Sequence, residues 1–291
     1  MKKRNSRYQI GLIILFFIGL SILLYPMVSD AWNRHRAKLL MSNYDKNVAT
    51  VDPLRYEQEK EIARAYNETL VGDAVPDAFA VREDVQDAVY ESMLNVGGDS
   101  IMGYVDIPSA DIRIPIYHYT FESVLQKGAG HLFGSSLPVG GTGTHATITA
   151  HRGLPSAKLF TDLNYLEVGN CFYLHILDEV LAYEVDDIAT VLPSETERLA
   201  IYPDKDLVTL VTCTPYGVNS HRLLVTGHRV PYSEETEETG LPLPQQIVKK
   251  GPQMLGQVLS MLAGVAVAVL ITKLADRKSG RKKRNIKDSE S

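Results

Sequence analysis

The sequence predicts a mainly β domain, a closed barrel or a sandwich, with an N-terminal helical extension and a membrane-spanning helix on either side. Two charge-free apolar runs lie near the two ends of the 291-residue chain. Between them, helix-forming residues come first, and short β-branched runs separated by Gly, Pro, Asp and Ser follow. With 45% hydrophobic and 22% charged residues, the chain has enough apolar side chains for a folded core.

Charge is distributed unevenly along the chain. The formal net charge is −5, yet the first 29 residues carry +4, and the residues from Lys273 onward carry +5 from eight basic and three acidic side chains. Subtracting both ends from the total leaves −14 for the middle of the chain. Phosphate would repel so acidic a domain, which argues against nucleic-acid binding.

The first apolar run, residues 8–28, follows a basic tail over residues 1–7 and contains no charged residue. Because about 20 helical residues cross a hydrocarbon core of roughly 30 Å, we expect a transmembrane helix here. A cleaved signal peptide is the alternative. The run is longer than the usual apolar region of such a peptide, and no small-x-small cleavage site closes it.

A second apolar run over residues 253–274 is charge-free up to Lys273 and precedes a basic tail over residues 275–291. Basic clusters favour the cytoplasmic side of a membrane, so we expect two spans, both termini in the cytoplasm and the acidic domain outside the cell. An acidic linker, residues 233–252, leads to this second span. A buried core helix is the alternative, but it leaves the basic tail unexplained.

Residues 29–96 are expected to form a helical extension that ends in a loop. Ala31 to Leu70 is rich in helix formers and includes a stretch begun by Pro53 with apolar side chains at near-helical spacing, so two helices are predicted. Residues 72–90 have weak periodicity and predict an irregular loop.

Residues 97–232 are expected to form one β domain. Short alternating or β-branched runs follow each other closely, which is typical of a barrel or a sandwich. The expected strands cover residues 101–108, 112–119, 145–151, 171–177, 180–192, 207–213 and 221–230.

The two cysteines are too few for a disulfide scaffold or a site of four thiolates. Cys213 ends an expected strand, and Thr214-Pro215 stops that strand. A side chain in this setting is held rigidly and stays accessible, which suits a nucleophile. Cys171 begins another strand and is expected to be a small buried hydrophobe. A disulfide between the two cysteines is the competing interpretation.

Histidine and arginine supply what a thiol nucleophile needs. A thiol with a pKa near 8.5 is mostly protonated at neutral pH and requires a base or a cation. His151 ends its strand before a loop, as Cys213 does. Arg222 begins the strand after a short loop, so a hairpin would return it beside Cys213, where a guanidinium can stabilise an oxyanion. A zinc site of His151, His221 and Cys213 is the weaker alternative, because no ligand pair has a familiar spacing.

These residues resemble the motifs of sortases. Residues 209–213, TLVTC, followed by Arg222 resemble the cysteine and arginine signature of the family, and residues 147–153, TITAHRG, resemble its histidine motif. Residues 130–153 and the loop from Cys213 to Arg222 resemble class C, pilin-polymerising sortases. The two anchors and the helical extension fit that class, and the resemblance covers residues 44–232.

The resemblance implies a closed sortase β-barrel and a cysteine transpeptidase. Cys213 would attack the Thr–Gly bond of an LPXTG-like sorting signal, and the lysine amine of a pilin subunit would resolve the thioester. His151 would act as general acid and base, and Arg222 as the oxyanion or substrate clamp. No metal or organic cofactor is needed for this acyl transfer.

Class C sortases also resemble one another in a lid, usually Asp-Pro-aromatic, over the active site. Here Asp77-Ala78-Phe79 supplies the acid and the aromatic ring, with Ala in place of Pro. The resemblance implies that Asp77 pairs with Arg222 and that Phe79 lies over Cys213. Without proline's fixed φ, the loop is expected to be looser. The segment Asp52-Pro53-Leu54 ranks second as the lid, and an ordinary loop is the remaining alternative.

Two other functions are weighed against pilin polymerisation. One is a housekeeping-type sortase that anchors proteins to peptidoglycan. The other is a non-catalytic membrane adaptor that binds exported peptides through its barrel.

Overall fold

The computed structural model describes residues 3–70, 75–81 and 86–239 of the chain. The chain divides into two compact units, residues 1–245 and 246–291, and every described residue belongs to the first unit. The second expected membrane span and the basic tail that follows it lie outside the described residues.

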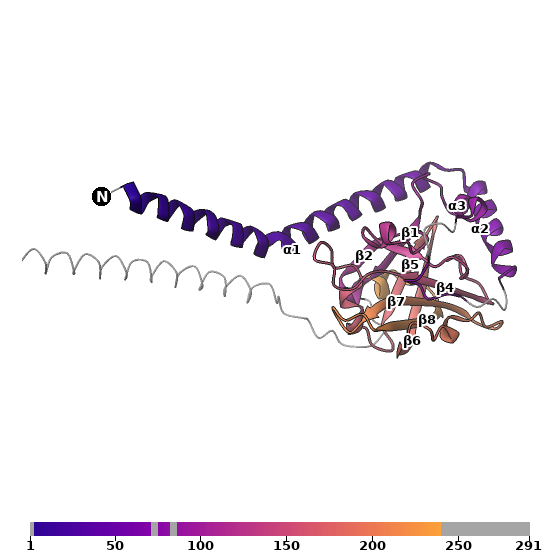
Figure 1. Ribbon diagram of the computed structural model, residues 1–291. Coiled ribbons are helices and arrows are strands. Elements are labelled where there is room, and N and C mark those ends of the chain that lie inside the picture. The colour runs from indigo at the N-terminus through magenta and orange to yellow at the C-terminus, as the bar shows by residue number, and fades with distance from the viewer. Residues whose placement is uncertain (1–2, 71–74, 82–85, 240–291) are drawn as a thin grey trace, which may run out of the picture. The chain divides into compact units, whose positions relative to one another are not determined.

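Helix α1, Lys3–Thr50, is a single helix of 48 residues (Figure 1, indigo). Its N-terminal half is apolar and exposed, as in Leu15 at 65% and Ile22 at 70%. Among the described helices, it is the one long and apolar enough to cross a membrane, with a mean hydropathy of 2.5 over its best window. These features support the expected N-terminal anchor.

The C-terminal half of α1 packs on the barrel. Ala37, Met41, Tyr44 and Val48 are all buried, and their spacing of four, three and four residues places them on one face of the helix. Tyr44 donates a hydrogen bond to the carbonyl of Met102 at 3.0 Å, and its hydroxyl accepts one from the amide of Leu177 at 2.7 Å. The span and the first helix of the extension are therefore one continuous element.

Helix α2, Pro53–Glu68, begins as the sequence predicts. Asp52 accepts a hydrogen bond from the amide of Leu54 at 3.0 Å, and Pro53 occupies the first helical position, where a missing N–H costs nothing. Asp52-Pro53-Leu54 is therefore a helix start, with Leu54 72% exposed. Part of the expected irregular loop forms a short helix, α3 Ala88–Ser92, because Asp87 caps its first amides.

Eight strands in the described part close into a barrel with the order β1-β2-β3-β4-β7-β8-β6-β5. The strands are β1 Ile101–Ile107, β2 Ile112–His118, β3 Ala129–His131, β4 Thr144–Thr149, β5 Cys171–Ile176, β6 Glu179–Val191, β7 Asp206–Thr214 and β8 His221–Val230. The pairs β2–β3 and β4–β7 are parallel, and the other neighbouring pairs are antiparallel. The closed barrel is confirmed and the sandwich is excluded.

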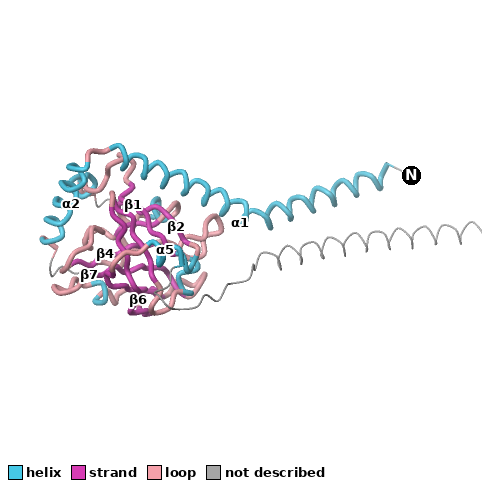
Figure 2. Tube along the Cα trace, turned by 180° about the vertical axis from the view of Figure 1, so that it is seen from behind, coloured by secondary structure: helices cyan, strands magenta, loops and turns pink. Residues whose placement is uncertain are grey.

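Short helices connect the strands. They are η1 Pro108–Ala110, α4 Glu122–Leu125, η2 Thr161–Tyr165 and η3 Glu197–Leu199, and α5 Glu234–Thr239 follows the last strand. Figure 2 shows the strands in magenta, gathered into one body that the second half of α1 reaches. Helix α5 lies within the segment expected to be an acidic linker, so this segment begins in a helical conformation.

Strand β5 illustrates how the alternating pattern builds the core. Phe172, Leu174 and Ile176 point into the main hydrophobic core, whereas Cys171 and Tyr173 lie in a smaller cluster on the other face of the strand. This is the core face that the sequence predicts for the strand.

Replacing Tyr44 with Phe is expected to lower the free energy of unfolding by about 1–3 kcal/mol, because the buried Leu177 amide and Met102 carbonyl lose their partner. Chemical denaturation of the full chain in detergent measures the change. Tyr202→Phe, at a ring 41% exposed, is the control and is expected to be neutral. Equal stability of the two variants would show that Tyr44 does not lock α1 to the barrel.

Candidate active site

Cys213 and Arg222 face each other across the β7–β8 hairpin. They are direct partners in the antiparallel register, and the Nη1 atom of Arg222 lies 3.6 Å from Sγ of Cys213. The loop between them returns the chain as the sequence predicts. Cross-strand partners on one face have side chains in contact, so the strand pairing itself holds the guanidinium beside the thiol.

Cys213 is buried, with 6% of the residue exposed. Burial raises the pKa of Cys213 above its ordinary value, the guanidinium of Arg222 lowers it, and the carboxylate of Asp77 raises it again. Burial is the largest of the three effects, so the thiol is held in its protonated form in this conformation.

Asp77 and Arg222 form a bidentate ion pair. Nε of Arg222 donates to Oδ1 of Asp77 at 2.8 Å, and Nη2 donates to Oδ2 at 2.7 Å. The two side chains are only 12% and 15% exposed, so water competes little for either charge. The hydrogen bonds to Asp77 are the main reason why the pKa of Arg222 is raised.

The ring of Phe79 contacts Arg222 and His151. Its ring centroid lies 4.8 Å from Cζ of Arg222, a cation–π contact, and 5.7 Å from the imidazole centroid of His151. The segment Asp77 to Phe79 thus touches Arg222 through both a carboxylate and a ring.

Burial anchors the segment that carries Asp77 and Phe79. Ala78 is 1% exposed and Val75 is 7% exposed, and both pack against side chains of the barrel, including Val211 and Leu224. The amide of Ala80 donates to the carbonyl of Asp77 at 2.9 Å, which closes a turn. These contacts restrain the segment although position 78 carries no proline.

His151 follows β4 and lies near the end of β7. The parallel β4–β7 register ends with Thr149 opposite Val211, and His151 and Cys213 each lie two residues further along. Thr212 donates to the carbonyl of Ala150 at 2.8 Å, which fixes the two chain ends together. Cys213 lies on the same face of β7 as Val211, and the hydrogen bond from Thr212 to Ala150 brings the loop that carries His151 beside it.

His151 contacts an acidic residue that the sequence did not indicate. Its Nε2 atom lies 3.0 Å from Oε2 of Glu122 on α4. Among the described residues, no hydrogen bond joins His151 to Cys213. The pKa of Glu122 is lowered chiefly by the amide of Gln126, and His151 adds to this effect. No local pattern could reveal Glu122, because only the closed barrel brings α4 to this loop.

Arg152 and Thr214 make a further link between the two loops. Nη1 of Arg152 donates to the hydroxyl of Thr214 at 3.0 Å. The residues that follow His151 and Cys213 are thus joined directly, which holds the two loops together at the end of the barrel.

Neither the Cys171–Cys213 disulfide nor the zinc site is supported by the structure. Cys171 is buried beside Tyr173 and Ala182, and both cysteines are free thiols, so no disulfide joins them. Burial raises the pKa of Cys171, and no cation is among the causes. Among the described residues, His151, His221 and Cys213 do not gather within metal-binding distance.

Comparisons with known proteins agree on one family. The family model of the sortase domain matches residues 105–230 of this chain. Sortase C of Streptococcus pneumoniae, whose structure is described as informative on catalysis and pilin substrate specificity, is 47% identical with a TM-score of 0.63, over 66% of this chain and 97% of that one. Sortase C-1 of Actinomyces oris is 46% identical with a TM-score of 0.58, over 60% and 99% of the two chains.

A sortase of another class, sortase A, also matches this chain. Sortase A of Bacillus anthracis is 26% identical over 223 residues, which are 77% of this chain and 94% of that protein. The higher identity to sortase C structures and the resemblance of the sequence motifs point to the same branch of the family. The chain therefore belongs to the class C sortases and is a cysteine transpeptidase.

Proposed function

We propose that this chain is a membrane-anchored transpeptidase that cleaves an LPXTG-like sorting signal between Thr and Gly and transfers the acyl group to a pilin lysine. The contact of the Cys213 thiol with the Arg222 guanidinium, fixed by strand register, carries the proposal. The relation to a pneumococcal enzyme described for its pilin substrate specificity supports the choice of substrate.

In the first half-reaction, the Cys213 thiol gives its proton to His151, and the resulting Sγ thiolate attacks the carbonyl carbon of the threonine. The C–N bond to glycine breaks, and His151 donates a proton to the departing amine. The product is a thioester on Cys213. Arg222 can donate N–H groups to the oxyanion of the tetrahedral intermediate, because its guanidinium already lies against the thiol.

In the second half-reaction, the amine of a pilin lysine attacks the thioester. A new amide bond forms, the C–S bond breaks as Cys213 leaves as a thiolate, and His151 accepts the proton of the attacking amine. No oxidant, metal or cofactor enters the balance. Repetition with further subunits would build a covalent fibre joined by isopeptide bonds.

Residues 75–81 act in this proposal as a lid on the resting enzyme. Asp77 occupies two of the donors of Arg222, and Phe79 covers the guanidinium and His151. A substrate that displaces both residues would free Nε and Nη2 of Arg222 as well as Nη1 for its oxyanion. The raised pKa of the Cys213 thiol fits a resting state of low reactivity.

The proposed topology places the catalytic domain outside the cell. Helix α1 supports an N-terminal anchor through its length and apolar surface. The second span over residues 253–274 and the cytoplasmic location of both termini follow from the charge pattern of the sequence.

A competition between two acceptors tests the function. The full chain in detergent is incubated with an LPXTG peptide, a peptide carrying a pilin acceptor lysine and an amine that mimics the peptidoglycan precursor. Mass spectrometry of the products identifies the acceptor. Transfer to the lysine peptide is expected, whereas transfer to the precursor amine alone would indicate a housekeeping-type sortase.

Replacing Cys213 with Ala is expected to reduce transpeptidation by at least about a thousandfold, because no other group can form the thioester. The same variant is expected to abolish pilin ladders in the cell-wall fraction of a strain without other sortases. Cys171→Ala is the matched control, since this thiol is buried in a separate cluster. Loss of activity in Cys171→Ala together with retained activity in Cys213→Ala would reverse the assignment.

Replacing Asp77 with Asn is expected to lower the pKa of Cys213, because a negative charge that raises this pKa is removed and Arg222 is freed. A lower pKa gives more thiolate at neutral pH, so alkylation by iodoacetamide at pH 7 should accelerate by about threefold to tenfold. The pH profile of the alkylation rate should shift to lower pH.

Asp187→Asn is the matched control for this variant. Asp187 pairs with Arg198 at 2.6 Å on the exposed surface, so the variant breaks an Asp–Arg pair remote from the thiol. Its alkylation rate is expected to equal that of the wild type. If Asp77→Asn behaves in the same way, Asp77 does not control the thiol.

A further inference from the structure

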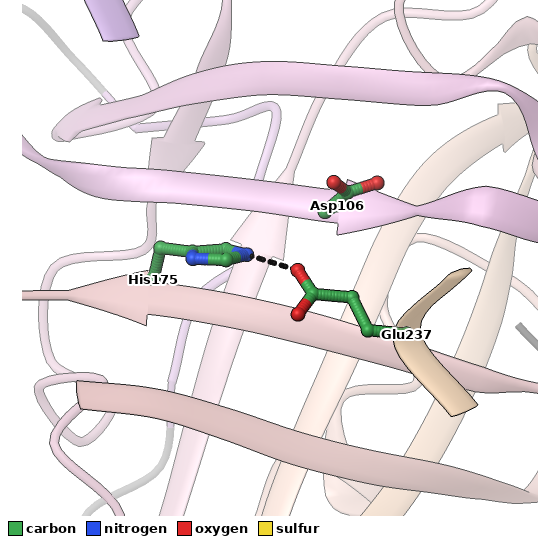
Figure 3. Close-up of side chains that lie close together, drawn as sticks. All are labelled: Asp106, His175 and Glu237. Atoms are coloured by element: carbon green, nitrogen blue, oxygen red, sulfur yellow. Dashed lines mark ion pairs between the residues drawn. The ribbon is translucent and has the colours of Figure 1, made fainter. Parts of the chain in front are cut away.

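Three side chains with metal-ligand chemistry converge where β1, β5 and α5 meet. Asp106, His175 and Glu237 each offer one ligand atom, and these atoms all lie within 4.8 Å of one another (Figure 3). Strand β1 pairs with β2 and β5, and neither β1 nor β5 pairs with the strands that carry Cys213 and Arg222. The cluster is therefore separate from the proposed active site.

The strand register directs Asp106 and His175 to the same side. Tyr104 is the register partner of His175, and Asp106 lies two residues beyond Tyr104. Val105 and Leu174 lie in the core, so the residues that alternate with them point to the outer face of the barrel. Glu237 comes from α5, and all three side chains are largely buried, with 15%, 13% and 20% exposure.

A second partner holds each of the three side chains in place. The imidazole of His175 stacks on Tyr104 with centroids 4.3 Å apart and an interplanar angle of 12°. Tyr232 donates a hydrogen bond to Oε2 of Glu237 at 2.5 Å, and Nε of Arg113 lies 3.3 Å from Oδ2 of Asp106. One oxygen of each carboxylate is thus held, as outer partners commonly hold the ligands of a metal.

The inner atoms of the cluster face one another. Nε2 of His175 lies 2.9 Å from Oε1 of Glu237, an ion pair by distance (Figure 3, dashed). This nitrogen nevertheless has no hydrogen bond of acceptable geometry within the described part of the chain, although it is buried. When Nε2 carries a lone pair instead of a proton, it cannot accept from a carboxylate, which has no proton to donate.

The two carboxylates are also unfavourable neighbours. Both are largely buried, and the guanidinium of Arg113 lies 3.3 Å from Asp106. A cation between the three inner atoms would neutralise the carboxylates and give the nitrogen of His175 a partner.

We propose that Asp106, His175 and Glu237 bind one divalent cation of the zinc class, with water as the fourth ligand. One imidazole nitrogen and two carboxylate oxygens are a ligand set that Zn²⁺ accepts. Bonds of about 2.0–2.1 Å in a tetrahedral site separate ligand atoms by roughly 3.3 Å. The separations in this cluster, from 2.9 Å up to at most 4.8 Å, bracket that value, and small side-chain movements of Glu237 bring the atoms together.

Such a cation would connect α5 to the barrel. Two ligands come from β1 and β5, and the third comes from α5, which precedes the segment leading to the expected second span. The site would therefore fix the point at which the chain leaves the barrel, and it requires nothing from Cys213.

The test uses the full chain in detergent, without a polyhistidine tag and stripped with EDTA. Calorimetric titration with ZnCl₂ is expected to show one equivalent bound, and Co²⁺ is expected to give the visible absorption of a four-coordinate site. Asp106→Asn, His175→Gln and Glu237→Gln should each weaken zinc binding by at least about tenfold.

His228→Gln is the matched control. Nδ1 of His228 lies 3.3 Å from Oδ2 of Asp186, another histidine–carboxylate pair, with exposures of 46% and 48%. This variant is expected to bind zinc as the wild type does. Equal binding by the wild type and all three ligand variants, or no binding by the wild type, would overturn the proposal.

Hydrogen exchange of the wild type gives a second readout that depends on no variant. Zinc is expected to slow amide exchange over residues 234–239, because the cation ties α5 to β1 and β5. Exchange that is the same with and without zinc would also overturn the proposal. Transpeptidation of the stripped enzyme is a separate measurement, so failure of the metal site and failure of the proposed function are distinguishable.

Discussion

Strand β7 pairs in parallel with β4 on one side and antiparallel with β8 on the other, and the rest of the site depends on these two registers. The first register brings the loop that carries His151 beside Cys213 at the end of the barrel. The second places Arg222 directly opposite Cys213. Because backbone hydrogen bonds along β7 and β8 fix their register, the position of Arg222 beside Cys213 does not depend on a loop.

The Arg222 guanidinium is the centre of the charged interactions at this end of the barrel. It contacts the thiol of Cys213, two oxygens of Asp77 and the ring of Phe79. A charge so largely removed from water needs a partner at all times, and the carboxylate is that partner in this conformation. The same group that could stabilise an oxyanion is therefore already occupied, which links access to the site with the chemistry of the site.

The sequence predicts most of this arrangement because its patterns are local. Alternating runs locate seven of the eight strands, and strand-end positions single out Cys213, His151 and Arg222. Strand β3 has only three residues, too few for an alternating pattern, and was not predicted. Glu122 and the cluster of Asp106, His175 and Glu237 depend on contacts between distant segments, which no local pattern records. The burial of Ala78 was missed for the same reason, since a motif shows that proline is absent but not what packs on its replacement.

The burial of the Asp77–Arg222 pair also decides how it responds to its surroundings. Dissolved salt screens exposed charges over about 8–10 Å but acts much less on pairs that water hardly reaches. With side chains only 12% and 15% exposed, this pair should persist over a wide range of ionic strength. The apolar contacts of Val75 and Ala78 do not weaken as salt rises either. Separation of the pair therefore calls for a molecule that competes for the guanidinium itself, and the ionic strength of the surrounding solution has little influence on it.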